Sequence, residues 1–183
     1  MNTERFIAFS CTHCPVEDPE AINWLISRIE EYKPSLIVHL GDGLEADSAS
    51  RFPAENDWDL KTEFDHFNGL LFNVRSAAPD DAACVFLEGN HDANLLEINR
   101  IDKRLRGLCD WRDTKNVPEM DNWLTPTKYR YDRRKGCYRI GQVVFSHGYE
   151  ANASAGKFEA VHFCNEFGLY IHGHTHRPAT HHQ

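Results

Sequence analysis

Five short turns along the chain carry side chains that can bind metal ions. Imidazole, thiolate, carboxylate and amide groups are all ligands for divalent transition metals. One turn of this kind is usually structural, whereas five in one chain indicate a shared metal site. The metal-competent side chains are Cys11 and His13 in the first turn, Asp42 in the second, Asn90 and His91 in the third, His147 in the fourth, and His174 and His176 in the fifth.

Each turn follows a short apolar run, which is typical of a strand covered on both faces. In α/β sheets, ligands bind beyond the carboxyl ends of the strands, so we expect the five turns to converge on one crevice. A Gly141-Gln142 turn also predicts a hairpin, in which residues 138–140 pair with the fourth strand. The five expected strands cover residues 5–10, 35–40, 84–87, 143–146 and 169–172.

Helices are expected between these strands. Asp18 suits the N-cap of the first helix, Pro19 suits its first position, and Pro34 ends it. The spacing of apolar and basic residues predicts three more helices, over residues 57–75, 95–109 and 158–164.

Together the five turns resemble the motifs of the calcineurin-like metallophosphoesterases, whose pattern is Asp-x-His, Gly-Asp, Gly-Asn-His-Asp/Glu, His and Gly-His-x-His. The resemblance spans residues 5–178. It implies a single α/β domain over residues 1–183, built as a four-layer α/β/β/α sandwich of two mixed sheets. The matching blocks are Cys11-Thr12-His13, Gly41-Asp42, Gly89-Asn90-His91-Asp92, His147-Gly148 and Gly173-His174-Thr175-His176.

The resemblance also implies a centre of two divalent ions, Mn, Zn or Fe, bridged by Asp42. Such a centre hydrolyses a phosphate ester with a bridging hydroxide, and we favour a phosphodiester as the substrate. His91, assisted by Asp92, is implied to stabilise the phosphoryl oxygens or to protonate the leaving oxygen. By the same resemblance, the ligands of the first metal are His13, Asp42 and His176, and those of the second are Asp42, Asn90, His147 and His174.

Cys11 departs from the family pattern, which has a metal-binding Asp at this position. Thiolate binds Zn or Fe well and Mn or Mg poorly, so a first site with Cys11 as a ligand favours Zn or Fe. Alternatively, the cysteine weakens the site, or it is a small buried thiol that binds no metal. A weakened site leads to a second candidate function, a catalytically impaired binding scaffold with the same fold.

Cys11 and Cys14 also form a Cys-x-x-Cys motif, which would make a disulfide in a redox module. A redox cysteine of this type lies at a helix N-terminus, whereas here the helix is expected to start only at Pro19. Redox chemistry also leaves the other four turns without a role. We therefore expect Cys14 to pack in the core.

The net charge of −8 argues against binding to nucleic acids or membranes over the whole surface, because that binding depends on Lys and Arg. Residues 99–139 nevertheless form a basic insertion with 12 of the 20 basic and 6 of the 28 acidic residues. Arg100, Lys103 and Arg104 are expected on one helical face, which either guides an anionic substrate or is simply solvated. Arg51, Arg100 and Arg104 are candidate contacts for a small phosphoester or a nucleic-acid end.

Residues 110–135 lack a clear periodicity, so we interpret them as irregular, with one strand over 127–131. In this segment, the indoles of Trp111 and Trp123 either pack in the core or stack on a base. His39 lies in an apolar run and is expected to be a core imidazole whose hydrogen bonds are satisfied.

The apolar stretch near the N-terminus, Phe6 to Phe9, is shorter than the core of a signal peptide. The sequence has no apolar run of membrane-spanning length, and its scattered cysteines are typical of reduced cytosolic thiols. We therefore expect a cytoplasmic protein without membrane contacts. Seven residues follow His176, fewer than the family uses to complete its second sheet, and an open sheet edge would favour a homodimer.

Overall fold

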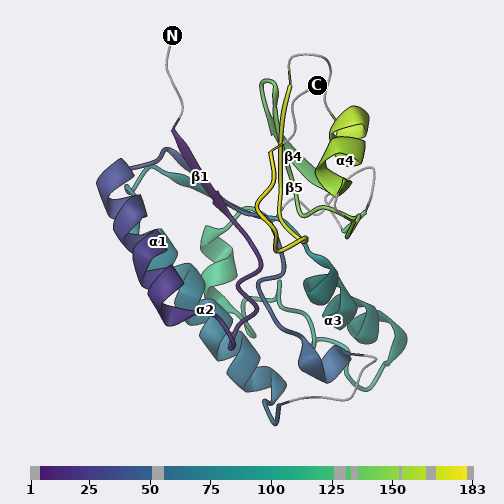
Figure 1. Cartoon of the computed structure of the whole chain (residues 1–183). Helices are drawn as coiled ribbons and strands as arrows, with labels where there is room; N and C mark the ends of the chain where they lie inside the picture. Colours follow the sequence, from purple (N-terminus) through teal and green to yellow (C-terminus); the bar gives the residue numbers. More distant parts are fainter. Residues whose placement is uncertain are drawn as a thin grey trace.

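Two three-stranded sheets contain the named strands of the described chain, and helices pack against both of them (Figure 1). The arrangement is that of a computed structural model, which describes residues 5–50, 56–125, 131–132, 136–152, 154–163 and 168–180. The four helices and two small sheets confirm the expected mixed α/β class. Arg51 and residues 127–130 of one expected strand lie outside the described residues.

The first sheet consists of β1 (Phe6–Phe9), β2 (Leu36–His39) and β3 (Ala83–Phe86), in that order. We expected two mixed sheets, but over the described residues this sheet is entirely parallel. The reason is that both connections are helical crossovers, which return the chain to run in the same direction. The turns that follow the three strands therefore lie at one edge of the sheet.

Helices α1 (Pro19–Tyr32) and α2 (Leu60–Ala77) make these two crossovers. Asp18 caps α1 as expected, because its carboxylate accepts hydrogen bonds from backbone N–H groups of the first turn, where Pro19 stands. Asp59 caps α2 in the same way. Both helices pack on one face of the first sheet (Figure 1).

Side chains of the first sheet alternate between two apolar clusters, as the period of a strand requires. Ile37 and Phe86 pack with residues of α1 and α2. Val38 and Val85 point to the other side, where they pack with Phe145 of the second sheet. The two sheets therefore share an apolar interface.

The second sheet consists of β4 (Cys137–Ile140), β5 (Val143–Ser146) and β6 (Leu169–His172). β4 and β5 form the expected antiparallel hairpin, whereas β6 runs parallel to β5, so this sheet is mixed. Helix α4 (Ala155–Phe163) connects β5 to β6 and packs on the sheet face opposite the first sheet.

Helix α3 (Asn90–Ile101) starts inside the third turn and ends halfway through the helix that we expected over residues 95–109. Its early start has a local cause, because the Asp92 carboxylate accepts the N–H of Gly89 at 2.8 Å and closes the first helical turn directly after β3. The chain beyond Ile101 forms successive turns instead of further helix.

The irregular segment after α3 contributes to the core. Trp111 and Trp123 are buried in the cluster beneath the first sheet, and the Trp111 indole N–H donates to the carbonyl of Asp92 at 3.1 Å. These indoles therefore pack in the core and offer no surface for a base. Two short 3₁₀ helices, η1 (Asp47–Ala49) and η2 (Pro118–Asn122), complete the described elements.

Candidate metal centre

Hydrogen bonds join the turns of the two sheets. Within the first sheet the Cys11 N–H donates to the Gly41 carbonyl, and within the second the Gly173 N–H donates to the His147 carbonyl, both at 3.0 Å. Between the sheets, the His174 N–H donates to the Cys11 sulfur at 3.3 Å. The turns thus meet at one place, as their positions at strand ends predicted.

The turns after β2 and β3 approach too closely for a side chain between them. A Cβ on Gly41 would lie 2.5 Å from the Gly89 nitrogen, and the φ of +103° at Gly41 also favours glycine. Because of this close approach, the His91 N–H reaches Oδ1 of Asp42 at 2.9 Å. The glycines therefore bring the second and third turns into direct contact.

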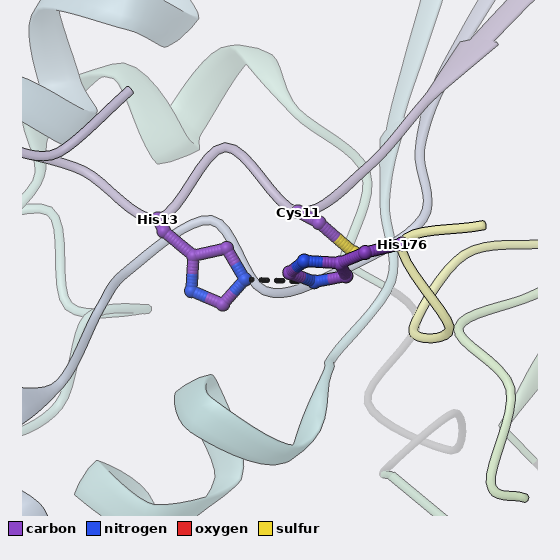
Figure 2. A group of neighbouring side chains, drawn as sticks. All are labelled: Cys11, His13 and His176. Atoms are coloured by element: carbon purple, nitrogen blue, oxygen red, sulfur yellow. Dashed lines mark hydrogen bonds between the residues drawn. The ribbon is translucent and has the colours of Figure 1, made fainter. Parts of the chain in front are cut away.

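One group of candidate ligands comprises Cys11, His13 and His176, whose donor atoms all lie within 4.8 Å of one another. Figure 2 shows the two imidazoles facing each other, with the Cys11 sulfur pointing toward His176. The Nε2 atoms of the two histidines are 3.3 Å apart. Two ligand atoms on one tetrahedral Zn lie roughly 3.3 Å apart, so this spacing suits a shared ion.

A second group surrounds the Nε2 atom of His147. Its Nδ1 atom donates to the Leu40 carbonyl at 3.0 Å, so Nε2 is the ring nitrogen directed at the site, where it holds either a proton shared with Asp42 or, in place of that proton, a metal ion. Oδ2 of Asp42 lies 3.0 Å from this Nε2 and Oδ1 of Asn90 lies 3.2 Å from it. The imidazole of His174 packs edge-on against that of His147. Three acceptor atoms in close contact make a suitable site for a cation.

Asp42 lies between the two groups. Its Oδ2 atom is 3.0 Å from Nε2 of His147 and 4.0 Å from Nε2 of His13. Burial alone would raise the pKa of this carboxyl, but the hydrogen bond and charge of His147 outweigh burial and lower the pKa to about 2. Asp42 is therefore an anion, placed where a carboxylate could face two metal ions.

Cys11 lies beside both groups, since its donor atom is also within 4.8 Å of those of Asp42 and His147. Burial raises the pKa of this thiol, and the N–H of His174 opposes that shift. Cys11 and Cys14 are both free thiols, so the disulfide of a redox module is not formed. Cys14 is fully buried in the core, as expected.

His91 stands next to His13, with the two rings edge-to-face at 4.7 Å between centroids. Its Nδ1 atom donates to the backbone carbonyl of Glu45 at 2.5 Å. This contact leaves Nε2 as the ring nitrogen that is not directed at Glu45.

Asp92 does not face the site. It is fully buried, and its two oxygens accept four backbone N–H groups, those of Asp42, Gly43, Leu44 and Gly89, at 2.8–3.2 Å. Burial and the nearby Asp42 carboxylate raise the pKa of Asp92, and the N–H groups of Gly89 and Leu44 oppose this. The expected assistance to proton transfer is thus corrected to a positioning role: Asp92 holds the turn that carries Asp42.

Two further buried carboxylates on helices hold other turns in the same manner. Oε2 of Glu63, on α2, accepts the N–H of Ala46 at 2.9 Å. Oε1 of Glu159, on α4, accepts the N–H groups of Tyr149 and Glu150 at 2.6 Å, directly after His147. The segments after β2 and β5 are therefore each held by an acid from the helix that follows them, which preorganises the side chains they carry.

His39 supports the site from the core, as expected of a satisfied imidazole. Its Nδ1 atom accepts the N–H of Gly41 at 3.1 Å, and its Nε2–H donates to the Thr12 hydroxyl at 3.0 Å. The hydroxyl in turn donates to the Gly43 carbonyl at 3.3 Å. Burial lowers the pKa of His39 to about 3, so the ring is neutral and the first two turns are linked by a fixed chain of hydrogen bonds.

The candidate ligands have an unusual backbone. Among the described residues, seven that are not glycine have a positive φ, and five of these are candidate ligands. Such left-handed conformations cost free energy and are concentrated at functional sites. The five are Cys11 at 56°, His13 at 51°, Asp42 at 53°, His174 at 66° and His176 at 50°.

The helical face expected for the basic segment does not form. Because α3 ends at Ile101, Lys103 and Arg104 do not continue a helical face with Arg100. The Arg100 guanidinium pairs with Glu97 at 2.5 Å, and that of Arg104 pairs with Asp102 at 2.7 Å. These arginines are exposed and paired with neighbouring acids, and their contact with an anionic substrate stays a prediction.

Sequence reasoning missed Glu45, Tyr131 and Tyr149. The Oε2 atom of Glu45 is 2.7 Å from Nδ1 of His13. The Tyr131 and Tyr149 rings stack 5.2 Å apart, and Tyr131 also contacts the His147 ring. Glu45 stands only three residues after Asp42, a closeness that could have drawn attention to it.

Nitrogen, oxygen and sulfur atoms that could hold a metal ion gather at the strand ends of the two sheets in this α/β protein. Residues 4–178 match the family model for calcineurin-like phosphoesterase, so the chain belongs to this family. The family generally consists of hydrolases that act on phosphate esters. A search of curated proteins finds no match. No described helix combines the length and the apolar character needed to cross a membrane.

Proposed function

We propose that this protein is a metal-dependent phosphoesterase that binds two divalent ions and hydrolyses a phosphodiester. The observation that carries the proposal is the position of Asp42. Its buried carboxylate lies between Nε2 of His13 and Nε2 of His147, so that two groups of lone-pair donors share one anion. This arrangement is what a pair of metal ions requires of a bridging ligand.

The side chains fit such a pair by their chemistry. Around His147 the donors are imidazole nitrogens and the oxygens of a carboxylate and an amide, whereas the other group adds the Cys11 sulfur. Sulfur favours Zn or Fe at the first site. In this proposal the first ion is held by Cys11, His13, Asp42 and His176, and the second by Asp42, Asn90, His147 and His174.

Divalent ions at this position supply Lewis acidity to a phosphoryl oxygen and lower the pKa of a water molecule. The chain contributes His91, whose Nδ1–H is engaged by the Glu45 carbonyl. Only the doubly protonated ring can therefore offer a second N–H, from Nε2, to a phosphoryl or leaving oxygen. His91 acts in this proposal as a cationic donor, and His13 beside it is a ligand.

Support for a diester comes from the aromatic pair next to His147. Tyr149 is 47% exposed and stacks on Tyr131, which in turn contacts the His147 ring. A monoester has one organic group, whereas a diester has a second that needs a surface. The exposed tyrosine offers an apolar contact for that second group.

The proposal includes the layer order of the family fold. The apolar clusters support it, since α1 and α2 pack on one side of the first sheet, the second sheet packs on the other, and α4 covers the far side of the second sheet. This order is α/β/β/α. It places the turns that follow the strands of both sheets next to one another.

Metal content and turnover test the proposal together. Purified protein would be loaded with Mn, Zn or Fe, analysed for bound metal, and assayed on a chromogenic phosphodiester and the corresponding monoester. We expect two ions per chain and faster hydrolysis of the diester. The Asp42→Asn protein should lose turnover, because a neutral amide is a poor bridge, while Glu31→Gln on the surface of α1 serves as a control.

Two ions without turnover of either ester would favour the impaired scaffold instead. The Cys11 substitution would then be its cause, and Cys11→Asp should restore hydrolysis. Absence of metal binding with every ion would overturn the proposal.

A further inference from the structure

Glu45 contacts two histidines of the site through two different groups. Its side-chain Oε2 lies 2.7 Å from Nδ1 of His13, and its backbone carbonyl accepts a hydrogen bond from Nδ1 of His91 at 2.5 Å. Potential ligand atoms of the three residues lie within 4.8 Å of one another. One residue therefore lies behind both rings, on the side away from their Nε2 atoms.

The backbone of Glu45 is held in place on both sides. Its N–H donates to the Cys14 carbonyl at 3.0 Å, and the next N–H, of Ala46, donates to the buried carboxylate of Glu63 at 2.9 Å. The carbonyl that receives His91 is thus fixed by the fold. The side chain of Glu45 is 28% exposed.

The Glu45 carboxylate is a potential hydrogen-bond partner for a buried ring nitrogen of His13. Over the described residues, Nδ1 of His13 is buried and has no aligned hydrogen bond, although the Glu45 oxygen is within reach. A rotation of the carboxylate would align the pair. A hydrogen bond from His13 to this carboxylate oxygen requires the ring proton to lie on Nδ1. A proton on Nδ1 leaves the Nε2 lone pair facing His176.

We propose that Glu45 is a positioning residue, whose carboxylate orients His13 for the first metal ion while its backbone carbonyl orients His91 toward the substrate. The inference rests on the proposed function, because it requires a metal at the first site. Carboxylates behind a metal-binding imidazole fix its tautomer and raise its basicity, and their loss typically weakens metal binding by about 10–100-fold. Only the contact with His13 depends on the Glu45 side chain, because the contact with His91 is made by the backbone carbonyl.

The test measures metal affinity in place of activity. Zn binding would be followed by competition with a chelator for the wild-type protein and for the Glu45→Ala, Glu45→Gln and Glu31→Gln proteins. The His176→Ala protein identifies which binding step belongs to the first site. We expect Glu45→Ala to weaken that step by about 10–100-fold, and Glu45→Gln to weaken it less, since an amide oxygen still accepts the proton.

In Glu45→Ala, the affinity of the second binding step should equal that of the wild type. The melting temperatures of the two metal-free proteins should also agree. Equal affinity of wild-type and Glu45→Ala proteins for both ions would overturn the inference alone. Weakening of both steps with a lower metal-free melting temperature would also overturn it, since the role would then be structural. A wild-type protein that binds no metal would instead overturn the proposed function.

Discussion

The Nε2 atoms of His13 and His176 lie 3.3 Å apart, although 163 positions separate these histidines in the sequence. His13 follows β1 of the first sheet and His176 follows β6 of the second. An ion bound by both would tie the two sheets together. Metal binding at this position should therefore affect the stability of the fold as well as its chemistry.

The His176→Ala protein tests this link. Saturating Zn should raise the melting temperature of the wild type, because a ligand at 100 times its Kd adds about 2.7 kcal/mol. In the variant the rise should be clearly smaller, since the first site loses a ligand. Because His176 is exposed, the melting temperatures of the two metal-free proteins should agree. An equal Zn-induced rise in both would contradict the shared ion.

Replacing Cys11 tests whether the thiol is a ligand. Cys11→Ala should reduce bound metal from two ions to one, whereas Cys11→Asp should retain two and shift the preference from Zn toward Mn, because oxygen is a harder ligand than sulfur. Metal analysis and the ratio of Mn-supported to Zn-supported activity measure these effects. Full occupancy of both sites in Cys11→Ala would show that the sulfur is not needed.

Asp92→Asn should destabilise the protein by about 2–4 kcal/mol, because an amide cannot accept all four backbone N–H groups in place of the buried carboxylate. Urea unfolding measures this loss. His91→Ala, by contrast, should lower kcat at nearly unchanged stability. If Asp92→Asn lowered kcat alone, with the free energy of unfolding unchanged, the original interpretation of Asp92 as a residue that assists His91 would be restored.

Glu63 should make stability depend on pH. Burial raises its pKa to about 7 from an ordinary 4.5, against the opposing effect of the backbone N–H groups it accepts. The folded protein then holds this proton more tightly than the unfolded chain does. Its contribution to the free energy of unfolding therefore falls as the pH rises from about 4.5 to about 7.

Glu63→Gln removes that contribution because an amide does not ionise. Relative to the wild type, the variant should gain about 1–3 kcal/mol between pH about 4.5 and pH about 8. Urea unfolding at several pH values, with a chelator present, measures the difference. Exposed Glu30→Gln is the matched control and should follow the wild type. Parallel curves for wild type and Glu63→Gln would refute a raised pKa.

The positions of the candidate ligands were predictable because they depend on local patterns. A buried strand followed by a turn is visible in the sequence, and parallel strands place their turns at one edge. For the same reason the cap of α1 at Asp18 and the hairpin at Gly141 were predicted correctly. What these features share is that neighbouring residues determine them.

The roles of Asp92, Glu45 and Arg100 could not be derived in this way. Asp92 looks catalytic beside His91, and only the fold turns its carboxylate toward the backbone of another turn. Glu45 reaches His13 because the chain after Asp42 curves back past the end of β1. The prediction of a basic helical face at Arg100 required a helix longer than α3, which ends at Ile101. Each depends on contacts between segments distant in sequence, or on where an element ends.

The left-handed backbone conformation of five candidate ligands raises the free energy of the folded state. Glycine adopts this conformation without strain, so replacing such a residue by glycine would relieve the backbone while removing the ligand. During evolution, a descendant released from selection for chemistry could lose these side chains and fold more readily than its ancestor. Each of these five side chains is therefore present at a cost in backbone free energy that glycine would avoid.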